Sequence, residues 1–103
     1  MLHDHKPLIS IIVTVFNSEE YLRECLNSIL NQSFDSFEVV IVDDGSSDSS
    51  SVICKEYEKL EKRFRLYELR KNVGISAARN FALSKCRGQY LIFVDSDDYV
   101  SPE

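Results

Sequence analysis

The chain contains 103 residues with a mass of 11.9 kDa, a size that fits one domain and leaves no room for two. Its composition is 44% hydrophobic and 28% charged, which is ordinary for a globular domain and excludes an intrinsically disordered chain. Twelve basic residues against seventeen acidic ones give a net charge of -5, so we expect no binding to nucleic acid.

The chain begins with a polar leader, residues 1–7, to which we assign no function. This segment lacks the apolar stretch of a signal peptide. No apolar run in the sequence approaches the ~20 residues that a membrane-spanning helix needs. We therefore expect a cytoplasmic protein, or one that binds peripherally at the inner face of a membrane.

Strands and helices alternate after the leader. Continuous β-branched and apolar runs predict buried strands at residues 8–16 and 37–42, the first of them buried on both faces. A shorter and weaker strand is predicted at 64–69, where Arg65 and Glu68 interrupt the apolar pattern, and a last strand at 90–94. Apolar residues at helical spacing predict helices between them, near residues 19–30, 52–62 and 76–85. Within the second helix we expect Ile53, Tyr57 and Leu60 to face inward. This order predicts an α/β fold with a Rossmann-like, mostly parallel sheet and helices on both faces.

Polar residues follow three of the predicted strands, in the segments 14–17, 43–45 and 95–98. The carboxyl ends of parallel strands meet at one edge of a sheet, and ligands bind at that edge. Carboxylates that crowd together resist ionisation unless a cation or hydrogen-bond donors relieve their repulsion. Oxygen ligands without His or Cys suit Mg²⁺ or Mn²⁺, which pair one or two carboxylates with substrate phosphates. The sequence therefore predicts a nucleotide and metal site.

Each of these residues also has a purely structural interpretation. Asp and Ser after a strand often cap helices or form turns, and this is our interpretation of Asp48 and Ser49. Asp43 fits a hydrogen bond within the loop as well as it fits a ligand contact. Asp44 and the acids in 95–98 have no basic neighbour in sequence, so turn formation alone does not explain them. Phe16, Tyr21 and Phe93 fit positions packed against the sheet or in the core.

A series of short motifs spanning residues 8–102 resembles family 2 glycosyltransferases. The motifs are Ser10–Asn17, Tyr21-Leu22, Gln32–Phe34, Val42–Asp48, Asn72–Gly74, Ala78–Asn80 and Val94–Asp98. The resemblance implies a GT-A fold and transfer of a sugar from a nucleoside diphosphate donor, expected to be a UDP-sugar, to an acceptor hydroxyl. It also implies a glycan or lipid-linked acceptor and a role in cell-surface polysaccharide biosynthesis.

The resemblance assigns nucleotide-binding roles to several positions of this sequence. Thr14 and Phe16 occupy the positions that flank the nucleobase, where an aromatic ring can stack. Asp44 resembles the acid that hydrogen-bonds the uracil imide, and Asp43 precedes it in the same nucleotide-binding motif. Arg79 occupies a position near the donor, although a surface ion pair is an equal interpretation of this arginine.

The segment 95–98 resembles the DxD region of the family, which implies Mn²⁺ or Mg²⁺ as cofactor. Asp97 would contact the ribose or the metal, and the metal ligands are expected among Asp95, Asp97 and Asp98. The family's catalytic unit is longer than this chain. We therefore expect residues 8–103 to form the nucleotide-sugar-binding half of a glycosyltransferase domain, truncated after the DxD region. The general base would lie beyond residue 103, so we expect the isolated chain to bind donor with little or no transfer.

Other classes of protein remain as alternatives. A phosphoacceptor signalling domain also builds Mg²⁺ sites from acids at strand ends, but it needs a lysine after its last strand. A haloacid-dehalogenase-type phosphatase carries a motif like that of residues 93–97 near its start, followed by a long domain. A non-catalytic nucleotide- or Mg²⁺-binding module is a third alternative. The open edge of a sheet would also permit a homo-oligomer.

Overall fold

Strands and helices follow one another in the order that the sequence predicts. The computed structural model describes residues 6–32 and 35–96, so Asp97 and Asp98 lie outside the described residues. The strands are β1 (Ile9–Val15), β2 (Phe37–Asp43), β3 (Phe64–Glu68) and β4 (Tyr90–Asp95). The helices are α1 (Glu19–Leu30), α2 (Ser50–Leu60) and α3 (Ile75–Leu83).

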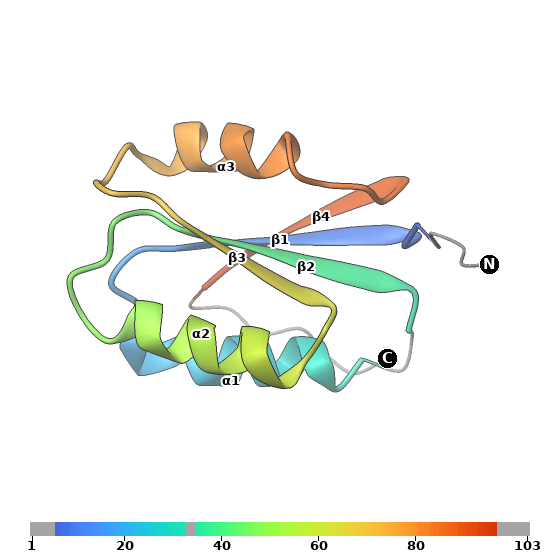
Figure 1. Ribbon diagram of the computed structural model, residues 1–103, viewed down its shortest axis with the longest axis horizontal. Helices are drawn as coiled ribbons and strands as arrows, with labels where there is room; N and C mark the ends of the chain where they lie inside the picture. Colours follow the sequence, from blue (N-terminus) through green and yellow to red (C-terminus); the bar gives the residue numbers. More distant parts are fainter. Residues whose placement is uncertain (1–5, 33–34, 97–103) are drawn as a thin grey trace.

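The four strands form one parallel sheet in the order β3-β2-β1-β4. Helices α1 and α2 cover one face of this sheet and α3 covers the other, which confirms the predicted fold class (Figure 1). The chain moves outward from β1 to β3 and then returns to place β4 on the other side of β1. A crevice at such a reversal, beyond the carboxyl ends of the strands, is the usual ligand site of an open α/β sheet.

Alternate residues of the central strands supply the core on each face of the sheet. The larger cluster packs β1 and β2 against α1 and α2, and the smaller one packs Ile12, Val40 and Val42 against Ala78 and Ala82 of α3. Small alanine side chains bring α3 close to the sheet, so the start of this helix is held near the carboxyl ends of β1 and β2. No helix within residues 6–32 and 35–96 has the length and apolar character needed to cross a membrane.

Three apolar residues expected in the interior are exposed instead. Leu60 is 83% exposed because it ends α2 and lies outside the packed face of that helix. Phe93 is 45% exposed because β4 is an edge strand, bordered by β1 on one side only within the described chain. Phe16 is 48% exposed because it follows the last residue of β1. The homo-oligomer expected through the sheet edge stays a prediction.

A buried carboxylate joins the strands at their amino ends. Glu38 accepts hydrogen bonds from the Ser10 hydroxyl at 2.6 Å, from the Arg87 backbone N–H at 2.6 Å and from the Arg65 guanidinium at 2.5 Å. Burial alone would raise the pKa of Glu38, but these three donors outweigh it and hold the pKa below its ordinary value. Glu38 thus ties β1, β2, β3 and the loop before β4 together.

Glu38→Gln removes the charge and should lower the free energy of unfolding by about 2 kcal/mol at neutral pH, because hydrogen bonds to a charged group are lost. A depressed pKa contributes stability above the unfolded-state pKa and loses it as the pH falls. The difference between the wild type and Glu38→Gln should therefore shrink once the pH falls below 4.5, the ordinary pKa of this side chain. Urea denaturation across that pH range measures the effect. An equal deficit at all pH values would contradict the role of the charge.

Candidate functional site

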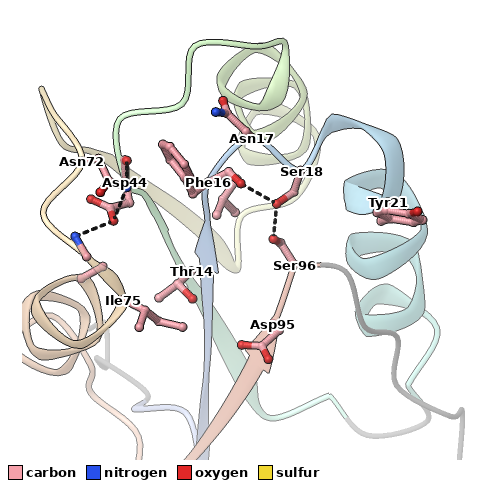
Figure 2. A pocket seen from close by; sticks show the side chains of 13 residues that line it. Thr14, Phe16, Asn17, Ser18, Tyr21, Asp44, Asn72, Ile75, Asp95 and Ser96 are labelled. Atoms are coloured by element: carbon pink, nitrogen blue, oxygen red, sulfur yellow. Dashed lines mark hydrogen bonds between the residues drawn. The ribbon is translucent and has the colours of Figure 1, made fainter.

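A cavity of about 620 Å³ opens beyond the carboxyl ends of the strands. Its walls come from the end of β1, the start of α1, Asp44, the loop and first turn of α3, and the end of β4. Asp44 and Ile75 lie on one side of β1, whereas Asp95 and Ser96 lie on the other (Figure 2). The topology therefore brings together residues of all three polar segments that the sequence placed at this edge, namely residues 14–17, Asp44, Asp95 and Ser96.

Asp44 is the buried acid of this cavity, with only 3% of the residue exposed. One carboxylate oxygen, Oδ1, accepts the Val73 backbone N–H at 2.7 Å. The other, Oδ2, accepts the Gly74 N–H and the Asn72 side-chain amide, both at 3.0 Å. A carboxylate oxygen can accept two hydrogen bonds, so Oδ1 keeps one acceptor direction open among the described residues. No cation pairs with Asp44 in the described chain, so its charge is held by neutral donors alone.

Two glycines allow this arrangement. Gly45 has φ +73°, and a Cβ there would approach the Asn72 backbone nitrogen to 2.6 Å. Gly74, with φ +97°, precedes α3 and turns the chain into that helix. Both backbone angles are in the region that side chains with a Cβ rarely adopt. The segment after β2 can therefore pass directly beneath the loop whose N–H groups Asp44 accepts.

Thr14 and Phe16 form the wall of the cavity that β1 provides. Figure 2 shows the Phe16 ring on the same side of β1 as Asp44, above Thr14, and all three residues line the cavity. An aromatic ring that is half exposed next to a buried hydrogen-bond acceptor offers a stacking surface and a polar contact to one planar ligand. This geometry suits the nucleobase position that the family resemblance implies. The core position that the sequence also suggested for Phe16 is wrong.

The loops after β1 and β2 are joined to each other by side chains. Asn17, which has φ 48°, accepts the backbone N–H groups of Ser47 and Asp48 at 2.8 and 3.3 Å. Asp48 accepts the N–H of Ser50 at 2.9 Å and that of Glu19 at 3.2 Å. The capping interpretation of Asp48 is confirmed, because it serves the first residues of both α1 and α2. These bonds fix the rim of the cavity.

Three other predictions from the sequence have different outcomes. Ser49 precedes α2, but its side chain makes no capping hydrogen bond. Asp43 is buried and accepts the Ser46 N–H at 3.2 Å, which matches the loop interpretation and keeps Asp43 out of the cavity wall. Arg79 donates to Asp95 at 3.2 Å and lies over the Phe93 ring at 5.3 Å, also outside the wall. Nucleotide contacts by Asp43 and Arg79 stay predictions.

Asp95 lies in the cavity wall at the end of β4, with its side chain half exposed. Within the described part of the chain, no three His, Cys, Asp or Glu side chains are grouped closely enough to hold a metal ion. The other two expected metal ligands, Asp97 and Asp98, lie outside the described residues. A metal site at this position therefore stays a prediction for all three acids.

Sequence reasoning gave no cavity role to Ser18, Tyr21 or Ile75, all of which lie in the wall. Ser18 and Ser96 join the start of α1 to the end of β4 through a 2.5 Å contact between their hydroxyl oxygens, and Ser96 is buried. Tyr21, expected to pack α1 against the sheet, is half exposed and lines the cavity, as does Ile75. The spacing of Tyr21 from the buried Leu22 and Cys25 places it beside the apolar stripe of α1 rather than in it.

Comparison with known proteins agrees with the family resemblance of the sequence motifs. A model of the family described as "Glycosyl transferase family 2" matches residues 10–103. The chain is 48% identical over 103 residues to glycosyltransferase GlyA of Streptococcus pneumoniae, covering 100% of this chain and 14% of that protein.

Two solved structures share the fold at high similarity. One is S. aureus TarS 1-349 in complex with UDP-GlcNAc, with a TM-score of 0.84, 41% identity, and coverage of 90% of this chain and 27% of that one. The other is the mannosyltransferase PcManGT of Pyrobaculum calidifontis in complex with GDP-Man and Mn²⁺, with a TM-score of 0.84, 26% identity, and coverage of 92% and 29%. The chain thus spans less than a third of each of these proteins. Because the family's pattern extends over most of the sequence and its fold is present, the chain belongs to glycosyl transferase family 2.

Proposed function

We propose that this chain forms the donor-binding part of an enzyme that transfers a sugar from a nucleoside diphosphate to an acceptor hydroxyl. One observation carries the proposal. A buried carboxylate, Asp44, has one open acceptor direction and lies beside the exposed Phe16 ring in a cavity of about 620 Å³. The volume lies within the range of small-molecule sites. The UDP-GlcNAc complex of TarS, a structure of the same fold, supports a nucleotide-sugar as the ligand.

The chemistry of Asp44 favours particular bases. An ionised carboxylate can only accept hydrogen bonds, so it favours a base that presents a ring N–H, as uracil and guanine do. Cytosine presents an unprotonated ring nitrogen at the corresponding position, which would repel the carboxylate. Among the bases with a ring N–H we propose uracil, and Phe16 would stack on it while Thr14 borders it.

In the proposed reaction an acceptor hydroxyl forms a bond to the anomeric carbon while the bond from that carbon to the diphosphate breaks. The proton of the hydroxyl passes to a general base, which we place beyond residue 103. The described residues of this chain bind and orient the donor, and fixed orientation is itself a large part of catalysis. We propose a glycan or lipid-linked acceptor in polysaccharide biosynthesis, and an enzyme located in the cytoplasm or at the inner face of a membrane.

The donor atoms at the end of β4 suit Mn²⁺ or Mg²⁺. Asp95 supplies a hard oxygen ligand in the cavity wall, and these ions bind one or two carboxylates together with substrate phosphates. When bound, such an ion neutralises charge that develops on the leaving diphosphate. Asp97 and Asp98 would complete the site. The Mn²⁺ complex of PcManGT supports this cofactor.

Replacing the charge of Asp44 tests the base contact. Asp44→Asn should weaken UDP binding about tenfold or more, because a hydrogen bond to a charged acceptor is worth about 1.5–3 kcal/mol. Calorimetric titration of the chain with UDP and with CDP measures it, and CDP should bind the wild type more weakly than UDP. Glu24→Gln, an exposed charge change on α1, serves as the matched control and should leave both affinities unchanged.

Asp44 also holds the loop 72–74, so the melting temperature of Asp44→Asn must be measured with its affinity. A folded Asp44→Asn variant that binds UDP as tightly as the wild type would contradict the contact. Equal affinity of the wild type for UDP and CDP would contradict it as well.

Removal of the metal tests the role of the DxD region. UDP should bind more tightly in the presence of Mn²⁺ than in the presence of EDTA. Asp95→Asn should reduce this difference in affinity, but UDP binding measured in EDTA should remain. The reason is that Asp95 would help to hold the ion, which would offset the charge of the diphosphate, whereas Asp44 and Phe16 would contact the base. Titrations with UDP and with uridine distinguish these contributions, since uridine has no diphosphate. An equal Mn²⁺ effect on uridine and UDP would contradict the assignment.

A further inference from the structure

A second cavity lies at the amino ends of the strands, at the opposite end of the sheet from Asp44. Its volume is about 400 Å³. The residues before β1, the start of β2, the turn between α2 and β3, and the loop before β4 supply its walls. In Figure 1 these segments meet at the right-hand end of the sheet, near the N-terminus. The proposed transfer reaction makes no use of this end of the molecule.

Basic side chains dominate the wall of this cavity. Two carboxylates, Asp35 and Glu38, face a larger number of cations. The cations are Lys6, Lys62, Arg63, Arg65 and Arg87. The whole chain carries a net charge of -5, so this positive region contrasts with the rest of the molecule. The cavity is therefore a local positive region in a protein whose net charge is negative.

Two of the arginines are already neutralised by protein groups. Arg65 donates to Glu38 at 2.5 Å and to the Lys85 carbonyl at 2.8 Å. Arg63 donates through Nε to Glu61 at 2.8 Å, and its guanidinium lies 4.3 Å from the centre of the Phe37 ring. Since these guanidinium groups have partners, they shape the cavity and add little free positive charge.

The remaining three cations are less fully neutralised, although Lys62 interacts with the charge of Glu61 and Arg87 with that of Glu38. Lys6, Lys62 and Arg87 are exposed, and neither lysine has an ion pair within the described residues. The Arg87 Nε lies 3.9 Å from the Glu38 carboxylate, which is too far for a hydrogen bond. Glu38 already accepts three donors, including the Arg87 backbone N–H. Three exposed cationic groups, whose side chains have no hydrogen bond to other described residues, therefore border one hollow.

We propose that this cavity binds the phosphate group of a small phosphate ester. A phosphate offers several acceptor oxygens around one charge, so it can satisfy two lysine ammonium groups and the fork of an arginine together. The volume of about 400 Å³ is near the lower end of small-molecule sites, which suits a phosphate with a short organic group. Pro7 and the Phe37 ring add apolar wall for that group. The same positive charge disfavours a metal cation.

Amide NMR with sn-glycerol 3-phosphate as the probe tests the proposal. Saturable shifts are expected at Lys62, Arg87 and Gly88, with a Kd on the order of 1 mM. Val73 and Gly74 report on the cavity beside Asp44 in the same spectra, so binding there is distinguished. Glycerol with sodium chloride at matched ionic strength controls for screening. Shifts confined to Val73 and Gly74, or no saturable shifts, would overturn the proposal.

Charge removal gives an independent readout. The double variant Lys62→Gln with Arg87→Gln should bind glycerol 3-phosphate about tenfold more weakly, or weaker still. The hydrogen bond from the backbone N–H of residue 87 to Glu38 is retained, because only the side chain of Arg87 changes. Lys59→Gln removes an exposed lysine of α2 outside the cavity wall and should bind as the wild type does. Equal losses in the double variant and in Lys59→Gln would overturn the proposal, because a general charge effect would then suffice.

Vesicles identify the source of the phosphate. A lipid headgroup would be supported if the chain cosediments with phosphatidylglycerol vesicles but not with phosphatidylcholine vesicles, and if the double variant no longer cosediments. Binding of glycerol 3-phosphate without cosedimentation would support a soluble phosphate ester in the same cavity. Cosedimentation that the double variant retains, without shifts at Lys62 and Arg87, would contradict the proposal.

Discussion

The hydrogen bonds that the Asp44 carboxylate accepts from the loop 72–74 shape the cavity and fix the start of α3. They join β2 to a helix that packs on the other face of the sheet, and Gly45 permits the close approach that they need. Without the carboxylate, the Val73 and Gly74 N–H groups would lose their acceptor next to the cavity. Hydrogen bonds to a charged acceptor are worth about 1.5–3 kcal/mol. The wall that contains Asn72, Gly74 and Ile75 therefore depends on one acid.

Two of the buried acids near the ends of β2, Glu38 and Asp44, have different roles because their hydrogen-bond partners differ. Glu38 pairs with the Arg65 cation and accepts two further donors, so its charge is balanced within the protein. Asp44 accepts neutral N–H groups alone among the described residues, so its charge and one acceptor direction remain available to a ligand. This contrast explains why Glu38 contributes to stability whereas Asp44 is suited to recognition. It also distinguishes the cavity beside Asp44 at one end of the sheet from the basic cavity at the other.

Much of the fold follows from the sequence, because the apolar runs and the helical spacing are strong signals. The meeting of the segments after β1, β2 and β4 also follows, since parallel strands end at one edge. The different environments of Asp43 and Asp44 depend on the loop geometry after β2, which no spacing rule gives. The exposure of Phe93 was missed because an apolar edge strand has the same pattern as a buried central one. Ser18 and Ile75 reach the cavity through tertiary packing alone.

The central claim is that Asp44 and Phe16 together receive the base of a uridine nucleotide. A crystal structure of the chain with UDP tests it most directly. The account predicts the uracil ring N–H within hydrogen-bond distance of Asp44 Oδ1 and the ring stacked on Phe16. A base bound away from Asp44, or a nucleotide held only by its phosphates, would contradict it.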